Sequence, residues 1–153
     1  MMKENSIPPC MIYIDKNGKW FHRGIEMIHK AIVNEFYRNL TIDSCGEYLI
    51  VRGSEKCFVE VEDTPFIITR VEFDDTGEAG EQQLILSLID DTSENLDPET
   101  LSVGADNVLY CRIKNNSFKA RFNRASYYQI ASRIKEEGDK YYLPLNNSKY
   151  YIV

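Results

Sequence analysis

Residues 11–22, MIYIDKNGKWFH, carry the strongest local structural signal in the sequence. Two runs of apolar and aromatic residues flank the polar stretch Asp15-Lys16-Asn17-Gly18. The dipeptide Asn17-Gly18 can supply the two positive-φ positions that a type I′ turn requires. The stretch therefore predicts a tight β-hairpin near the beginning of the fold.

A helix and a second hairpin are predicted after this first hairpin. Apolar residues recur every four positions, which predicts one buried stripe on a helix from about residue 26 to residue 39. The residues of the stripe are Ile28, Ile32, Phe36 and Leu40. Residues 48–51 and 56–61 then predict an extended pair that turns at Gly53-Ser54.

The same order of elements is predicted near the C-terminus. Residues 108–113 and 118–122 predict two strands that turn at Asn115-Asn116, and Asn123 is placed to cap a following helix. Tyr127, Ile130, Ala131 and Ile134 form the apolar face of that helix.

A closing hairpin is predicted after this second helix. Gly138 is expected to end the helix, and residues 141–143 and 150–153 to pair through Asn146-Asn147, with the last strand facing the core. The predicted fold class is therefore α+β, with two hairpin-helix-hairpin repeats, mainly antiparallel sheets and a pseudo-twofold relation between the halves.

The domain organisation follows from this repeat. An additional hairpin, from residues 66–73 and 83–89, is expected to extend the first sheet. The predicted parts are a flexible N-terminal tail of residues 1–10, a first lobe of residues 11–90, an acidic linker of residues 91–107 and a second lobe of residues 108–153.

The charges of the chain are strongly segregated. The formal net charge is −6, but the stretch from Glu60 to Asp106 has fourteen acidic residues and one basic residue, Arg70, and so carries −13. The rest of the chain therefore carries +7. Most of this positive charge comes from Arg112, Lys114, Lys119, Arg121, Arg124, Arg133 and Lys135.

Strand alternation places several of these cations on one side of the predicted hairpin of residues 108–122, with Tyr110 as a stacking surface. The candidate binding residues are Tyr110, Arg112, Lys119, Arg121 and Arg124, with Glu62 and Asp63 as acidic counterparts. One interpretation is a site for an external anion. The other is internal neutralisation by the acidic segment, with Glu62 and Asp63 as a clasp that binds Arg121 and Arg124 between the lobes.

No catalytic residue, metal ligand or cofactor is predicted. The sequence contains no G-x-S-x-G, H-E-x-x-H or glycine-rich phosphate-binding motif, and His22 and His29 are interpreted as solvated side chains. The four cysteines, Cys10, Cys45, Cys57 and Cys111, lack metal-binding spacing and are interpreted as reduced thiols. With no apolar stretch long enough for export or for a membrane span, a cytoplasmic location is predicted.

Three stretches resemble, in order and spacing, a bacterial family known as domain of unknown function 1285 (DUF1285). They are residues 14–20, IDKNGKW, residues 55–66 with the sequence VEDTPF at their end, and residues 118–124, FKARFNR. The resemblance implies an α+β fold with repeated motifs, no known activity and a role in signalling. The chain departs from the family at residues 52–54 and 107–109, and at the second of these it lacks a histidine.

These observations predict a non-enzymatic cytoplasmic binding or signalling module. Its partner is expected to be a protein or a small anionic ligand, and no oligomeric state is predicted. One alternative is a small enzyme that acts on a phosphorylated or carboxylated metabolite, with the arginines as substrate clamps. Another is weak nucleic-acid binding through the basic hairpin, which the acidic net charge disfavours.

Overall fold

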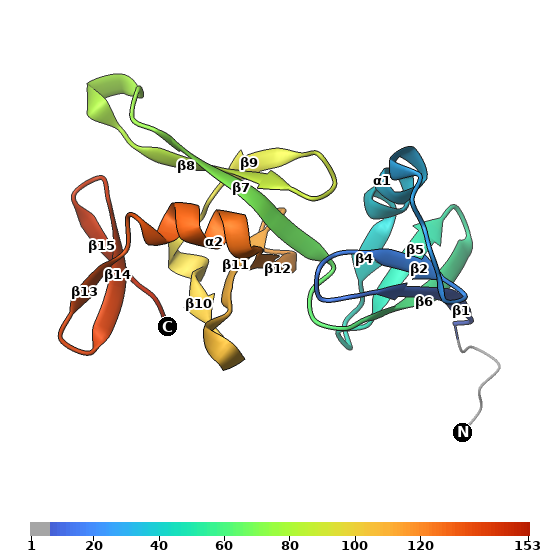
Figure 1. The fold of residues 1–153 in the computed structure, drawn as a ribbon. Coiled ribbons are helices and arrows are strands. Elements are labelled where there is room, and N and C mark those ends of the chain that lie inside the picture. Colours follow the sequence, from blue (N-terminus) through green and yellow to red (C-terminus); the bar gives the residue numbers. More distant parts are fainter. Residues whose placement is uncertain (1–6) are drawn as a thin grey trace. The chain divides into compact units, whose positions relative to one another are not determined.

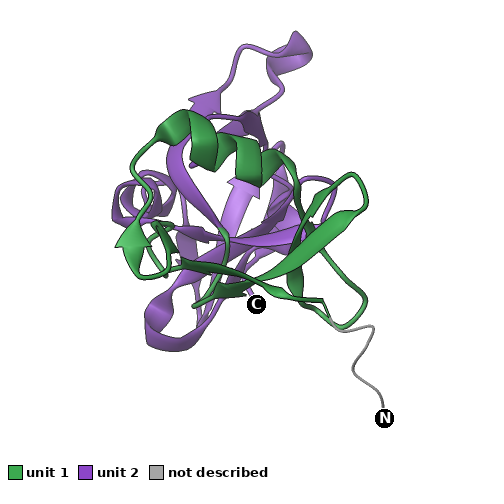
Figure 2. Ribbon diagram, turned by 90° about the vertical axis from the view of Figure 1, so that its right-hand side faces the viewer, with its two compact units in different colours: residues 1–65 green, residues 66–153 purple. Residues whose placement is uncertain are grey.

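The computed structural model describes residues 7–153, which form two compact units. The first unit ends at Pro65 and the second extends from Phe66 to Val153 (Figure 2). Residues 1–6 of the predicted N-terminal tail lie outside the described residues, and the first strand already begins at Pro9. Neither helix in the described part of the chain is long and apolar enough to cross a membrane.

The first unit contains a six-stranded sheet with the strand order β3-β2-β1-β6-β5-β4 (Figure 1). The central pair, β1 and β6, is parallel, and the other pairs are antiparallel. The strands are β1 (Pro9–Ile14), β2 (Trp20–His22), β3 (Ile25–Glu26), β4 (Leu40–Ile42), β5 (Tyr48–Arg52) and β6 (Glu55–Val61).

The predicted first hairpin is confirmed, but its turn is of another type. Within the turn, residues 15–18, only Gly18 has positive φ, at 82°, and the backbone N–H of Asp15 donates to the carbonyl of Lys19. The Asp15 carboxylate accepts hydrogen bonds from the backbone N–H groups of Asn17 and Lys19. This side chain stabilises a longer loop with a single glycine in the left-handed region in place of a two-residue type I′ turn.

Helix α1 (Lys30–Arg38) covers one face of this sheet with a stripe that differs from the predicted one. Val33 and Tyr37 are buried, and the ring of Tyr37 meets that of Trp20 edge to face at 4.8 Å between centroids. Ile28 and Ile32 are instead 76% and 50% exposed. Ile28 precedes the helix, so the four-residue spacing that begins there does not mark the buried face.

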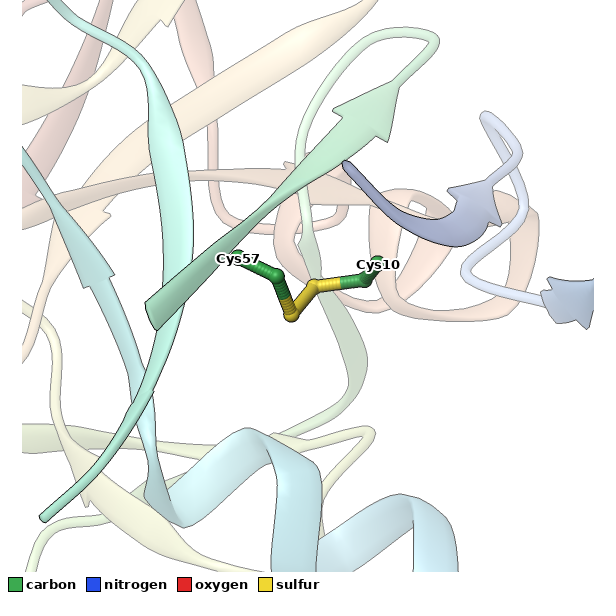
Figure 3. The surroundings of a disulfide bond; sticks show 2 residues. All are labelled: Cys10 and Cys57. Atoms are coloured by element: carbon green, nitrogen blue, oxygen red, sulfur yellow. A yellow bond between two sulfur atoms is a disulfide. The ribbon is translucent and has the colours of Figure 1, made fainter. Parts of the chain in front are cut away.

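A disulfide between Cys10 on β1 and Cys57 on β6 corrects the prediction of four reduced thiols (Figure 3). The two residues are 47 positions apart in sequence, but the parallel pairing of β1 with β6 brings their Cα atoms to 4.9 Å. Cys45 and Cys111 are free, the first exposed and the second buried. Burial raises the pKa of the Cys111 thiol to about 12, which keeps that thiol protonated.

The second unit contains a six-stranded sheet with the order β10-β11-β12-β7-β8-β9. Its central pair, β7 and β12, is again parallel, so each strand of the first sheet has a counterpart six strands later. The strands are β7 (Phe66–Asp74), β8 (Gln83–Leu88), β9 (Ser93–Asn95), β10 (Ser102–Val103), β11 (Leu109–Ile113) and β12 (Phe118–Phe122). The predicted α+β class with two similar halves is confirmed.

The second half contains other elements than the predicted repeat. The hairpin of β7 and β8, expected to extend the first sheet, belongs to the second because β7 pairs with β12. Residues 91–107, the predicted linker, contain β9, β10 and two single-turn helices, η2 (Pro98–Thr100) and η3 (Ala105–Asn107). Leu96 and Leu101 of this segment are buried, so it is part of the core. A further single turn, η1 (Glu78–Gly80), lies between β7 and β8.

Helix α2 (Arg124–Ala131) follows β12 and packs on β7. The predicted cap is confirmed: the side chain of Asn123 accepts a hydrogen bond from the backbone N–H of Ser126. The Ser126 hydroxyl donates to the carbonyl oxygen of Ile68 at 2.7 Å, which attaches the helix to the strand. On the predicted apolar face, Ile130 is fully buried but Tyr127 is exposed.

A three-stranded antiparallel sheet ends the chain, with β13 (Lys135–Glu137), β14 (Lys140–Leu145) and β15 (Ser148–Tyr151) (Figure 1). The prediction that Gly138 ends the second helix is wrong, because Gly138 forms the turn between β13 and β14. The closing hairpin through Asn146-Asn147 is confirmed. Its core side is Leu143 and Leu145 on β14, whereas Val153 is 88% exposed.

Candidate functional site

The register of β11 and β12 brings four of the candidate residues to one side of the second sheet. Tyr110 lies opposite Arg121, and Arg112 lies opposite Lys119. Directly opposed residues of an antiparallel pair share a face. We call this set, Tyr110, Arg112, Lys119 and Arg121, the basic face.

Arg112 and Lys119 are both exposed and occupy neighbouring positions across the two strands. The Arg112 guanidinium donates to the carbonyl oxygen of Asn116, with Nη2 at 3.2 Å. The Lys119 ammonium lies 4.2 Å from the centroid of the Tyr110 ring. Within residues 7–153, neither cation contacts a carboxylate.

Tyr110 orients Lys119 and is not the open stacking surface that the sequence predicted. Only 7% of the tyrosine is exposed. A Cβ atom on Gly104 would lie 2.8 Å from a carbon of the Tyr110 ring, so the bare backbone of Gly104 packs against the ring. The ring is thus held between Gly104 and the Lys119 ammonium, a cation–π contact. No sequence pattern marks Gly104, because its role depends on this close approach.

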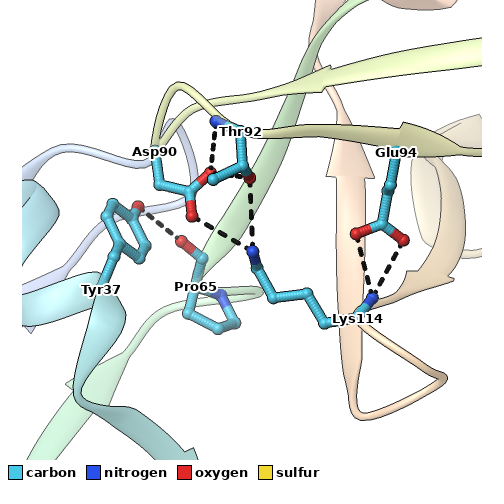
Figure 4. A network of polar contacts seen from close by, with 6 residues as sticks. All are labelled: Tyr37, Pro65, Asp90, Thr92, Glu94 and Lys114. Carbon is cyan, nitrogen blue, oxygen red and sulfur yellow. Dashed lines mark hydrogen bonds and ion pairs between the residues drawn. The ribbon is translucent and has the colours of Figure 1, made fainter.

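Two other cations of the basic segment are neutralised by the acidic segment within the second unit. Lys114 lies in the turn after β11, and its Nζ is 3.3 Å from the carboxylate of Asp90 and 3.3 Å from the hydroxyl of Thr92 (Figure 4). Arg133 lies 4.0 Å from the carboxylate of Asp75. Acidic residues of the same unit therefore neutralise Lys114 and Arg133, whereas Arg112 and Lys119, on either side of Lys114 in sequence, are exposed.

Arg121 and Arg124 differ in their surroundings. Arg121 is half-buried on the basic face, opposite Tyr110 and beside Ile67 of β7. Arg124 is exposed in the first turn of α2, with its guanidinium carbon 5.9 Å from the centroid of the Tyr128 ring. A cation at a helix N-terminus faces the positive end of the helix dipole, so this position gives Arg124 no electrostatic stabilisation.

Glu62 and Asp63 belong to the first unit, and Glu62 has a role there in the first hairpin. Its carboxylate accepts a hydrogen bond of 2.8 Å from the backbone N–H of Lys16. Partial burial and, secondly, the Glu62 carboxylate raise the pKa of Tyr13. The clasp of Glu62 and Asp63 with the arginines joins residues of different units and stays a prediction.

A cavity of about 650 Å³ lies on the other side of the second sheet. Leu109, which alternates with Tyr110, lines it together with Tyr127 of α2 and Tyr141 of β14. Among residues 7–153 no group of three or more histidine, cysteine, aspartate or glutamate side chains is arranged to hold a metal ion. The cations of the basic face can form charge-assisted hydrogen bonds to an anion.

Two solved structures share this architecture. A DUF1285 family protein from Silicibacter pomeroyi DSS-3 has a TM-score of 0.78 and 20% identity, over 95% of this chain and 79% of that chain. A second, from Shewanella baltica OS155, has a TM-score of 0.65 and 23% identity, over 80% of this chain and 91% of that chain. The chain has the DUF1285 fold. The resemblance seen in the sequence is thereby confirmed at the level of the fold, while no protein-family model and no curated protein matches the chain.

Proposed function

We propose that this DUF1285-fold protein is a non-enzymatic binding module whose basic face holds an acidic segment of a protein partner. The observation that carries the proposal is the pair of exposed cations, Arg112 and Lys119, which are directly opposed across β11 and β12 and contact no carboxylate among residues 7–153. Like charges in such a position destabilise a sheet, by up to roughly 1 kcal/mol. Carboxylates of a bound acidic segment would offset this repulsion through charge-assisted contacts with each cation.

The spacing of the cations favours an extended acidic segment. Lys119 and Arg121 are two residues apart on one strand, which separates their Cα atoms by about 7 Å. Carboxylates on alternate residues of an extended peptide repeat at the same distance. Arg112 adds a charge one strand away, roughly 5 Å to the side. A peptide with acidic residues at alternate positions therefore matches the basic face in both charge and period.

The disulfide supports a revised compartment as part of this proposal. Disulfides persist mainly in oxidising compartments, whereas cytosolic thiols are kept reduced. Because Cys10 and Cys57 are bonded, we infer that the protein acts in an oxidising environment and not in the cytoplasm that the sequence predicts.

The proposal is tested by titrating the full chain with a fluorescent peptide of alternating glutamate and serine and measuring anisotropy. Exposed charge pairs contribute roughly 0.2–1 kcal/mol each, so Arg112→Gln or Lys119→Gln should each weaken binding about 1.4- to fivefold, and the double variant by about the product of the two factors. Lys135→Gln, which removes an exposed cation from β13, is the matched control and should change affinity little. Binding should also weaken as salt rises.

Three results would overturn the proposal. They are a peptide that does not bind, a peptide that binds the double variant as tightly as the wild type, and a single-stranded oligothymidine of equal charge that binds more tightly than the peptide. The last result would favour the nucleic-acid alternative, for which the salt dependence should be steep.

A further inference from the structure

The first unit has a cavity of about 540 Å³ beside α1, within the range of small-molecule sites. Ile12 and Ile50, both buried, line it from the sheet, and Phe36 lines it from the helix. The Cys10–Cys57 disulfide, which Figure 3 shows, also contributes to the lining. The interior is thus formed mainly by hydrocarbon and sulfur atoms, a surface that attracts apolar groups.

The disulfide and an irregularity in β1 shape this end of the sheet. The pairing of β1 with β6 shifts register between Pro9 and Tyr13, and Met11 has a φ of 61° within the shift. Bulges of this kind redirect side chains and occur often beside binding sites. Because the disulfide joins the same two strands at Cys10, the irregular strand is held in place.

Two of the charged or polar side chains that line the cavity, Arg52 and Lys56, are cationic. Arg52 shares a face with Ile50 by strand alternation, and His22 lies opposite Ile12. Arg52 and Lys56 are exposed and contact no carboxylate within residues 7–153. Glu55, across the hairpin from Arg52, is the single acid among the lining residues. Arg52, Lys56 and Glu55 together give the lining a formal charge of +1, and the carboxylate of Glu35 on α1 also interacts electrostatically with Arg52.

An apolar interior with one net positive charge defines the class of ligand. The interior takes a hydrocarbon chain or ring, and the arginine at the opening takes an anion through paired N–H donors. The carboxylates of Glu55 and Glu35 repel a dianion, such as a phosphate monoester, about twice as strongly as a single carboxylate, so they favour the monoanion. We propose that this cavity binds a monocarboxylate with an apolar body, with Arg52 as the residue that binds the carboxylate.

The test is isothermal titration calorimetry of the oxidised full chain with octanoate, with 1-octanol as the uncharged counterpart. Octanoate should bind with one site per chain, and 1-octanol at least about tenfold more weakly. Arg52→Gln should weaken octanoate binding about tenfold, because hydrogen bonds to charged groups are among the stronger ones. Glu55→Gln should strengthen it about threefold, because a neighbouring like charge is removed.

Two further variants distinguish binding in this cavity from binding elsewhere on the protein. Arg112→Gln, on the basic face of the second unit, should leave octanoate binding unchanged, so this proposal and the proposed function can fail independently. Met27→Trp, which fills the half-exposed wall of the cavity, should abolish binding while the protein still melts cooperatively. Trp20, the single tryptophan of the natural chain, stacks on Phe36 at 6.1 Å, so its emission should shift on binding.

The proposal is overturned if octanoate does not bind, if 1-octanol binds as tightly, or if Arg52→Gln binds octanoate like the wild type. Loss of binding in Arg112→Gln would also contradict it, because that outcome assigns the ligand to the basic face.

Discussion

The two six-stranded sheets have the same strand order but hold their parallel central pairs in different ways. In the first sheet, β1 and β6 are joined by the Cys10–Cys57 disulfide across an irregular register. In the second, β7 and β12 are paired in regular register. Phe66, Ile68 and Ala120 in that pair are each no more than 1% exposed. In the first pair Ile14 and Val59 are also buried, at 0% and 3% exposed, so the first unit adds a covalent bond to the close packing that both pairs share.

The two units also differ in where the helix that covers the sheet occurs along the chain. In the first unit, α1 lies between the third and fourth strands of the sheet. In the second unit that connection contains only the single turn η2, and α2 comes after the sixth strand. In a sheet of this topology the covering helix can thus follow either the third or the sixth strand, because a helix at either position can pack on the apolar face of the sheet.

The largest expected effect concerns the disulfide. Replacing both Cys10 and Cys57 by alanine, or reducing the bond, should lower the free energy of unfolding of the first unit by about 4 kcal/mol, because the bond closes a loop of 47 positions. Urea unfolding followed by Trp20 emission measures this unit, since Trp20 is the only tryptophan. Cys45→Ser, at an exposed free cysteine, is the control and should have little effect.

An unchanged urea midpoint after reduction would show that packing alone holds β1 to β6, and the contrast between the two sheets would disappear. The buried thiol of Cys111 should not complicate the experiment, because its pKa of about 12 leaves little reactive thiolate at neutral pH.

A smaller effect is expected at the helix N-termini. Asn123 caps α2 with its side chain, whereas His29 precedes α1 without a side-chain cap. Asn123→Ala should therefore lower the free energy of unfolding by about 1 kcal/mol, and His29→Asn should raise it by roughly 0.5–1 kcal/mol. Urea unfolding followed by circular dichroism measures both changes. If His29→Asn stabilises nothing, the α1 N-terminus is satisfied in another way and the two helices are more alike than their caps indicate.

The smallest effect concerns the three-stranded sheet, which has no counterpart among the described residues of the first unit. The pKa of Glu137 is lowered by a hydrogen bond from the Tyr151 hydroxyl and, secondly, by contacts with Lys149. Because the folded-state pKa lies below the unfolded value of about 4.3, this stabilisation is present above that pH and is lost as the pH falls through the folded pKa.

Glu137→Gln should accordingly lower the melting temperature slightly at pH 7, and the difference from wild type should vanish in acid. Glu136→Gln, at an exposed neighbour on the opposite side of β13, is the matched control. A difference that persists unchanged below the folded pKa would mean that the glutamate acts through packing and not through its charge.

Features that depend on neighbours in sequence were predictable. Asn123 was identified as a cap because its side chain reaches a backbone N–H three residues away. The turns at Gly53-Ser54, Asn115-Asn116 and Asn146-Asn147 were located because few residues tolerate the backbone angles of tight turns. The stripe from Ile28 failed because periodicity alone does not identify where a helix begins.

The candidate site was predictable only in part. The positions of Tyr110, Arg112, Lys119 and Arg121 followed from strand alternation, once the turn had been placed. The sequence does not show that Lys114 is neutralised while Arg112 is exposed, because the partner of Lys114, Asp90, lies 24 positions earlier in the chain. The burial of Tyr110 depends on Gly104, whose approach to the ring is set by the packing of a separate loop.

The sequence by itself determined the hairpins, the helix cap, the charge segregation and the α+β class, since each follows from local backbone preferences or from composition. Only the tertiary structure decided which strands pair in parallel, and with that which hairpin belongs to which unit and which cysteines bond. Parallel pairing joins residues that are far apart in the chain. Its free energy comes from burial of surface between them, and no local pattern records that burial.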